Sequence, residues 1–244
     1  MSNRYIEQLA PTGVLRAGIN MSNFLLVNSK TTAGEPAGVS PDMAKAIAAK
    51  LGVGLTLIPY DGPGDVADGA VKNEWDIANI AAEAERAKTI TFSPAYCEIQ
   101  ATYLLPANTA ITCVEDVDKV GIRIAVKERA AYDLWLTDNL VNATLVRTAS
   151  MDESYNVFKQ QSLEALAGLR PRLLEDASKL IGSRLLDDSF TAIQQSIGCL
   201  PGNKDAAAFL SEFVKESIST GFVAKLIAKH GVTGKLTVSS TVAP

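Results

Sequence analysis

The stretch that most constrains the fold of this chain runs from Trp75 to Pro106. We expect a short buried strand at 76–80, a polar turn that carries Arg86, the segment I-T-F-S-P-A-Y, and a long apolar strand at 99–105. An arginine held beside strand ends is a natural anion clamp, because its guanidinium stays charged and its rigid fork of donors matches a carboxylate. The alternative is a solvated arginine at the start of a surface helix.

Strand-like and helix-like segments alternate along the rest of the chain. Strands are expected at 14–19, 55–59, 76–80, 99–105, 120–126, 145–147, 162–169 and 190–198. Helices are expected at 41–51, 66–72, 128–140, 151–161, 173–180, 206–219 and 222–229. Ser40 is the expected N-cap of the first of these helices, with Pro41 in its first turn. This alternation predicts parallel strands joined by right-handed crossovers.

Composition narrows the classes of partner. Lys and Arg total 23 against 27 Asp and Glu, a formal net charge of −4, which argues against a nucleic-acid partner. No apolar run approaches the ~20 residues that a membrane-spanning helix needs. The first thirteen residues lack an apolar signal-peptide core, so we expect no signal peptide. Two readings stay open, a cytoplasmic protein or one whose export signal is missing from this sequence.

Cysteine and histidine are scarce. Cys97, Cys113 and Cys199 form no C-x-x-C pair, so neither a disulfide framework nor a zinc site is expected, and all three thiols should be reduced. His230 is the single histidine and follows an expected helix, which favours a contact at the helix end. Nucleophilic catalysis that depends on histidine is therefore unexpected. We expect no metal and no cofactor.

The order of strand, Arg86 turn, F-S-P-x-Y and crossing strand resembles the type II periplasmic solute-binding proteins. The similarity is to solute-binding protein family 3, the branch that delivers amino acids to ABC importers. In that family the arginine holds the carboxylate of the ligand, and Arg86 occupies its position. Residues 38–52 resemble the family's G-F-D-x-D-L-A segment, 121–132 the start of its second lobe, and 220–231 its final helix.

This resemblance implies an α/β fold with two lobes, each a mostly parallel sheet flanked by helices. Two crossing strands, near 97–105 and 193–198, would join the lobes. Residues 1–100 and 195–244 would form lobe 1, and residues 101–194 lobe 2. Ligands of such folds bind at strand ends in the cleft between the lobes.

The first-lobe half of the expected site departs from the family pattern. The family has hydroxyls before the arginine, where this chain has Asn79, Ala81 and Glu83. Glu83 either turns to solvent or recognises a cationic or hydroxyl group of the ligand. Three residues fall on the loop that stacks on the ligand in the family: Asn20, Asn23 and Phe24. Asparagine at a strand end is otherwise a common turn residue.

The second-lobe half departs as well. Arg129 stands where the family has glycine in a flexible anion-binding turn. Leu169 stands where the family has an acid that holds the ligand's amino group. The adjacent Arg170 would instead bind a second acidic group of the ligand. The alternative for each arginine is a surface ion pair, with Asp133 for Arg129 and with Glu175 for Arg170.

The leading hypothesis is therefore a monomeric, non-catalytic receptor for a small carboxylate, which closes like a hinge and delivers its ligand to the membrane subunits of an ABC importer. The family implies a periplasmic location. One alternative is an enzyme similar to cyclohexadienyl dehydratase, with Glu83 or Glu128 as general acid. Another is the effector-sensing domain of a regulator.

Overall fold

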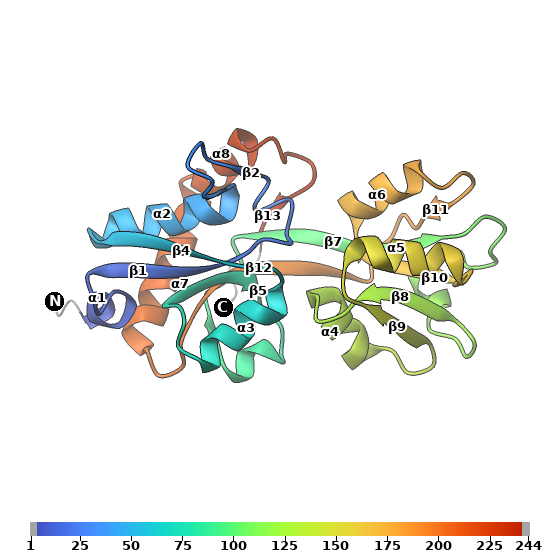
Figure 1. Cartoon of the computed structure of the whole chain (residues 1–244), viewed down its shortest axis with the longest axis horizontal. Helices are drawn as coiled ribbons and strands as arrows, with labels where there is room; N and C mark the ends of the chain where they lie inside the picture. Colours follow the sequence, from blue (N-terminus) through green and yellow to red (C-terminus); the bar gives the residue numbers. More distant parts are fainter. Residues whose placement is uncertain (1–3, 241–244) are drawn as a thin grey trace. The chain divides into compact units, whose positions relative to one another are not determined.

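The computed structural model describes residues 4–240. The chain forms two compact units: unit 1, Met1–Glu98 with Gln194–Pro244, and unit 2, Ile99–Ile193. It passes from one unit to the other within β7 (Cys97–Leu105) and β12 (Thr191–Cys199), which are neighbours in the main sheet (Figure 1).

Unit 1 is built on parallel strands in the order β4 (Gly54–Tyr60), β1 (Val14–Asn20) and β5 (Ile77–Ala81), with β12 antiparallel beside β5. Its helices are α1 (Arg4–Leu9), α2 (Val39–Leu51), α3 (Pro63–Val71), α7 (Lys204–Ser219) and α8 (Phe222–Lys229). Its short elements are β2 (Ser29–Lys30), β3 (Pro36–Ala37), β6 (Thr91–Phe92), β13 (Thr237–Val238) and the 3-10 turn η1 (Arg86–Lys88). The predicted strands and helices of this unit are present, with ends shifted by a few residues.

The start of α2 differs from the sequence prediction. Ser40 is not the N-cap, because the helix begins at Val39 and Gly38 caps it without a side-chain hydrogen bond. Gly38 has φ 152°, and a Cβ atom there would lie 2.2 Å from the carbonyl oxygen of Leu26. Ser40 N–H donates to that same carbonyl at 3.0 Å. The close approach of two backbones therefore sets the helix start, and only glycine fits it.

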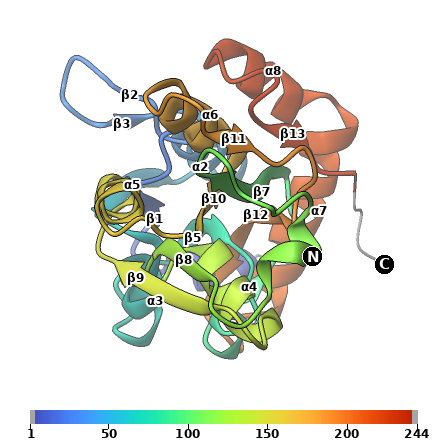
Figure 2. The same cartoon turned by 90° about the vertical axis from the view of Figure 1, so that its right-hand side faces the viewer.

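Unit 2 repeats the arrangement with β9 (Thr144–Thr148), β8 (Arg123–Lys127) and β10 (Ala165–Leu169) as parallel strands and β7 antiparallel beside β10. Its other elements are α4 (Ala131–Asn139), α5 (Met151–Gln160), α6 (Arg170–Ser178), β11 (Arg184–Leu185) and the 3-10 turn η2 (Val114–Val117). Figure 2 shows these elements from the end of the unit.

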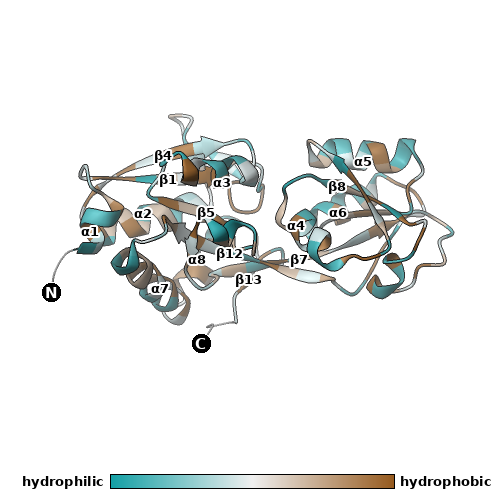
Figure 3. Cartoon of the chain, turned by 90° about the horizontal axis from the view of Figure 1, so that it is seen from below, coloured by the Kyte–Doolittle hydropathy of each residue, from teal (hydrophilic) through white to brown (hydrophobic). Residues whose placement is uncertain are grey.

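The core of unit 2 explains the pattern of α5. Tyr155 and Phe158 of this helix pack with Leu166 of β10 and Leu173 of α6 in one buried cluster. The rest of the helix is largely polar, and Figure 3 shows both hydrophilic and hydrophobic residues along it. An apolar stripe with this spacing is what holds an amphipathic helix on a sheet.

One pair of charges recurs in both units. Arg16 is the third residue of β1, and its backbone N–H and Nε both donate to Asp76 Oδ2, at 2.8 and 3.1 Å, while Nη2 donates to Oδ1 at 2.7 Å. Arg123 at the start of β8 makes the same three bonds to Glu164, at 2.8, 3.0 and 2.8 Å. Each acid directly precedes the neighbouring parallel strand, so each pair ties together the amino-terminal ends of two strands.

The Arg123–Glu164 pair makes stability depend on pH. Its hydrogen bonds, with that from the Arg123 side chain the largest cause, lower the pKa of Glu164 below the ordinary 4.5. A lowered folded-state pKa means that the contribution is complete above about pH 4.5 and is lost as the pH falls below it. Glu164→Gln should therefore lose less stability than the wild type between about pH 7 and about pH 3 in urea unfolding. Equal losses in both proteins would contradict this.

The cysteines are free thiols. Cys97 and Cys199 lie buried in unit 1, and burial raises the pKa of Cys199 to about 11. Such thiols behave as small apolar side chains. Among residues 4–240, no helix has the length and apolar character that crossing a membrane requires.

Candidate functional site

The carboxyl ends of β1, β4 and β5 lie together at one edge of the unit 1 sheet. The parallel register pairs Asn20 with Tyr60 and Ile19 with Asn79. Open parallel sheets bind ligands outside this edge. The predicted first-lobe residues all lie on these strands or on the segments that follow them.

Arg86 opens the η1 turn just beyond β5. Its side chain is buried, with the residue only 4% exposed, and Nη1 donates to the carbonyl of Ala81 at 2.9 Å. Its own carbonyl accepts from the N–H of Ile90 at 3.0 Å, which closes the turn. A guanidinium withdrawn from water in this way is costly unless anions or fixed dipoles surround it.

The loop after β1 holds its asparagines by their carbonyl oxygens. Asn20 Oδ1 accepts from Ser22 N–H at 3.1 Å and from Ser22 Oγ at 2.8 Å. Asn23 is buried, and its Oδ1 accepts from Leu25 N–H at 3.3 Å. Both are turns of the asparagine type that local sequence favours. Phe24, which follows Asn23 in the chain, is partly exposed.

Asn79 lies inside unit 1. Its Nδ2 donates to the carbonyl of Ser40 at 2.9 Å, and its Oδ1 is buried without a hydrogen-bond partner in the described chain. Ser40 Oγ and Tyr96 Oη are also buried without a hydrogen-bond partner in the described chain. Burial raises the pKa of Tyr96, and the nearby Ser40 hydroxyl opposes the rise. Glu83 is partly exposed, and its carbonyl accepts from Ala87 N–H at 2.9 Å.

In unit 2 the carboxyl ends of β8, β9 and β10 also share one edge, and α4, α5 and α6 begin there. Arg129 is exposed with φ 58°, the left-handed conformation that glycine adopts easily, so α4 starts at Ala131 and not at the predicted 128. Its N–H donates to Asp133 Oδ2 at 2.8 Å. Asp133 Oδ1 accepts from Arg147 Nε at 2.9 Å.

Arg170 binds backbone carbonyls. Its Nη1 donates to Leu186 at 3.0 Å, and Nη2 donates to Asp187 and Asp188 at 2.8 and 2.9 Å. These bonds tie the first turn of α6 to the segment that leads into β12. The carbonyls take the place of the Glu175 carboxylate that the sequence offers as an alternative partner.

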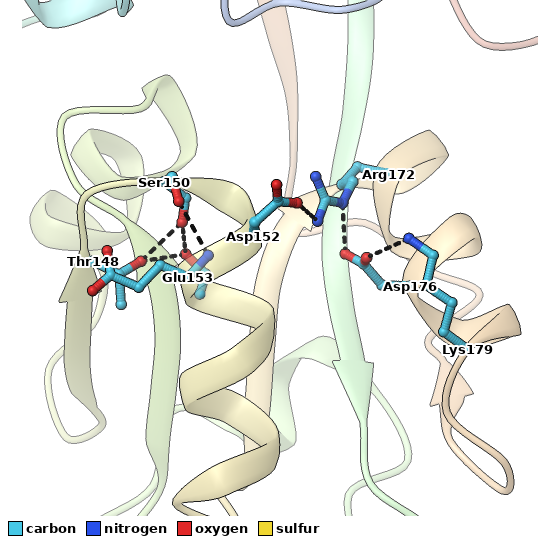
Figure 4. A network of polar contacts seen from close by, with 8 residues as sticks. Thr148, Ser150, Asp152, Glu153, Arg172, Asp176 and Lys179 are labelled. Atoms are coloured by element: carbon cyan, nitrogen blue, oxygen red, sulfur yellow. Dashed lines mark hydrogen bonds and ion pairs between the residues drawn. The ribbon is translucent and has the colours of Figure 1, made fainter.

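Arg172 is a further candidate for ligand binding that was not predicted from the sequence. Its Nε donates to Asp176 Oδ2 at 2.8 Å, and Nη2 donates to Asp152 Oδ1 at 2.6 Å, so the guanidinium lies between two acids (Figure 4). Burial works against the charged form, but the two acids outweigh it and raise the pKa of Arg172. The helix was expected at 173–180 but begins at Arg170, which places Arg172 and Asp176 four residues apart on one helix. That spacing was the available signal.

No group of three or more histidine, cysteine or acidic residues in the described part of the chain is arranged to hold a metal ion.

Comparison with known proteins gives a family and a fold. The model of the bacterial extracellular solute-binding proteins, family 3, matches residues 15–233. A comparison with curated proteins finds none that matches.

Several solved structures share the fold. A binding component of an ABC transporter from Wolinella succinogenes, in complex with lysine, is 20% identical with a TM-score of 0.74, over 92% of this chain and 98% of that one. An amino acid ABC transporter substrate-binding protein from Streptococcus pneumoniae, bound to L-arginine, is 20% identical with a TM-score of 0.73, over 92% and 97%. An ancestral amino acid-binding protein, described as a precursor of cyclohexadienyl dehydratase, is 20% identical with a TM-score of 0.73, over 92% and 98%. The predicted two-lobed α/β fold class is confirmed.

Proposed function

Because the chain belongs to the bacterial extracellular solute-binding proteins of family 3, we propose that it binds a small carboxylate-containing solute without converting it and delivers that solute to an ABC importer. The single observation that supports a carboxylate ligand is the position of Arg86. Its guanidinium is buried in the turn beyond β5, at the carboxyl edge of the unit 1 sheet. Its rigid fork matches a carboxylate in two parallel hydrogen bonds. Water competes poorly at a buried donor, so this contact would dominate binding.

The other predicted residues complete the proposed site. In unit 1, Asn20 and Asn23 use Oδ1 in their own turns, which leaves the Nδ2 donors for the ligand. Phe24 would pack on the ligand's apolar part. Asn79 and Glu83 would support the Arg86 turn and meet a hydroxyl or amino group. In unit 2, Arg129 and Arg170 stay candidate contacts at the edge where α4 and α6 begin.

A thermal-shift screen tests this function. The panel contains amino acids, monocarboxylates, dicarboxylates and prephenate-like acids, each compared, where it exists, with the amide in which the carboxylate is replaced by an uncharged group. A ligand that binds only the folded state raises the melting temperature in proportion to the logarithm of its concentration. We expect at least one acid to do so while its amide does not. A panel in which no acid shifts the transition would contradict the proposal.

We further propose that free α-amino acids are not the preferred ligands. Leu169 ends β10 as a buried apolar side chain, and an apolar side chain offers nothing to an ammonium group. Leu169→Asp should strengthen the binding of amino acids by about tenfold in calorimetry, the worth of one charged hydrogen bond. Leu169→Asn is the uncharged control and should gain less. Micromolar binding of an ordinary amino acid by the wild type would show that another acid holds the amino group.

The family description points to a place outside the bacterial cytoplasm. We propose the periplasm as the compartment, the membrane subunits of an ABC importer as the partner, and a monomer as the working state.

A further inference from the structure

A pocket with a volume of about 250 Å³ lies in unit 1 between residues of α2, α7 and α8, the helices labelled in Figure 1. The α2 residues that line it are Ala46 and Lys50. They belong to the half of α2 next to the amino-terminal edge of the sheet, because β4 begins after only two further residues. The pocket is therefore separate from the carboxyl edge of the sheet, where Arg86 lies.

The wall of this pocket is largely apolar and aromatic. Phe213 of α7 is buried and Phe222 of α8 is partly exposed. The ring of Phe213 stacks with that of Phe209 one turn earlier, with centroids 6.5 Å apart and planes at 21°. Phe209 in turn stacks on Tyr5 of α1 at 4.7 Å. This row of rings holds Phe213 in place, and a preformed aromatic wall favours another ring as its occupant.

Ser217 of α7 brings an unpartnered hydroxyl to the pocket. The residue is only 4% exposed, and its Oγ makes no hydrogen bond within residues 4–240. The other hydroxyl at the pocket, that of Thr220, already donates to the carbonyl of Glu216 at 2.7 Å. A buried hydroxyl without a partner costs free energy, which a hydrogen-bonding group on a ligand would recover. Ser217 therefore favours a ring that carries such a group.

The charges at the pocket offset each other. Lys50 of α2 and Glu216 of α7 form an ion pair, with side chains 42% and 56% exposed. No other charged side chain of the described chain lines the pocket. An anion would be attracted by Lys50 and repelled by Glu216, and a cation the reverse. The pocket therefore favours a neutral ligand.

The volume of the pocket limits the size of that ligand. A cavity of about 150 Å³ holds benzene. Pockets for drug-sized ligands begin at about 300 Å³. A pocket between these sizes suits one aromatic ring with a small substituent.

We propose that this pocket is a second binding site, which takes a small neutral aromatic molecule of the phenol type. The ring packs on Phe213 and Phe222, and the hydroxyl group of the ligand forms a hydrogen bond with Ser217 Oγ. The site uses none of the residues assigned to carboxylate binding, so it stands or falls independently of the proposed function.

Titration of the whole chain with phenol and with toluene, followed by backbone-amide NMR, tests the inference. The two probes share the ring, and only phenol carries a hydroxyl. Both should cause saturable shifts at the amides of Phe213, Ser217 and Phe222. Shifts at these amides that do not saturate up to the solubility limit of phenol would overturn the inference.

Ser217→Ala tests the hydrogen bond. It should lower the ratio of phenol affinity to toluene affinity by about three- to tenfold, the worth of one neutral hydrogen bond. The affinity for toluene should stay unchanged. The ratio cancels the difference in apolar character between the two probes. An unchanged ratio would overturn the role of the Ser217 hydroxyl.

Ala46→Leu fills the pocket and should abolish the binding of both probes. Ala49→Leu is the matched control, because Ala49 lies on the same helix, is exposed and does not line the pocket. It should bind both probes like the wild type. Circular dichroism and thermal unfolding establish that each variant is folded. Equal binding by the two variants would show that the probes bind elsewhere.

Two other occupants would contradict the proposal. If phenylacetate or benzylamine shifts the same amides with higher affinity than phenol, the ligand is charged. If sedimentation shows a dimer that Ala46→Leu dissociates, the pocket is occupied by a second copy of the chain. The proposal predicts that phenol binds most tightly of the three and that Ala46→Leu leaves the sedimentation unchanged.

Discussion

Replacing Asp76 by alanine is expected to destabilise the protein by roughly 2–3 kcal/mol, the cost of leaving a partly buried arginine without its acid. Asp76 has a side chain only 5% exposed and accepts three hydrogen bonds from Arg16, one of them from the backbone. Those hydrogen bonds raise the pKa of Arg16. The Arg16 side chain is 33% exposed, so water recovers part of the loss, and the estimate lies below that for a fully buried pair.

Urea unfolding of Asp76→Ala measures this loss. Glu212→Ala is the matched control, because Glu212 and Lys215 form an ion pair on the surface of α7 with both side chains largely solvated. Such a pair should be worth less than about 1 kcal/mol. If the two variants lose equal stability, the Arg16–Asp76 pair does not hold the amino-terminal ends of β1 and β5 together.

Replacing Arg86 by alanine is expected to weaken the binding of any acid ligand by at least about 1.5 kcal/mol, which is more than a tenfold loss of affinity. The donor is buried and needs no further dehydration, so most of its interaction with a carboxylate counts toward binding. Arg86→Lys should recover part of the loss, because lysine keeps the charge without the rigid fork.

Calorimetry with the best acid from the thermal-shift screen measures the effect. Lys88→Ala is the matched control: Lys88 shares the η1 turn with Arg86, but its side chain is exposed and pairs with Glu85. We expect unchanged affinity in that variant. Unchanged affinity in Arg86→Ala, in a protein that unfolds normally, would remove Arg86 from the ligand site.

Local pattern was enough to predict most of the fold. The alternation of apolar strands with amphipathic helices, and the turn that carries Arg86, depend on residues close in sequence. The start of α2 was not predictable in this way. It depends on the contact of Gly38 with the carbonyl of Leu26, which local N-cap preference does not describe.

The arginines of unit 2 also show that local sequence does not predict contacts between residues far apart in the chain. The segment Arg170-Pro171-Arg172 offers two similar side chains, and the sequence favoured the one next to Leu169. The backbone carbonyls of residues 186–188 accept hydrogen bonds from Arg170, whereas two acids, one from α5 and one from α6, orient Arg172. Which arginine is held by which group depends on tertiary contacts, and spacing along the chain carries little of that information.

The most direct test of the central claim is calorimetry on wild type and Arg86→Ala, followed by recovery and NMR analysis of the ligand after prolonged incubation with the wild type. Binding without conversion predicts one ligand per chain, a large loss of affinity in Arg86→Ala, and a ligand recovered chemically unchanged. Conversion of a prephenate-like acid would contradict the claim and support a dehydratase with Glu83 or Glu128 as its acid.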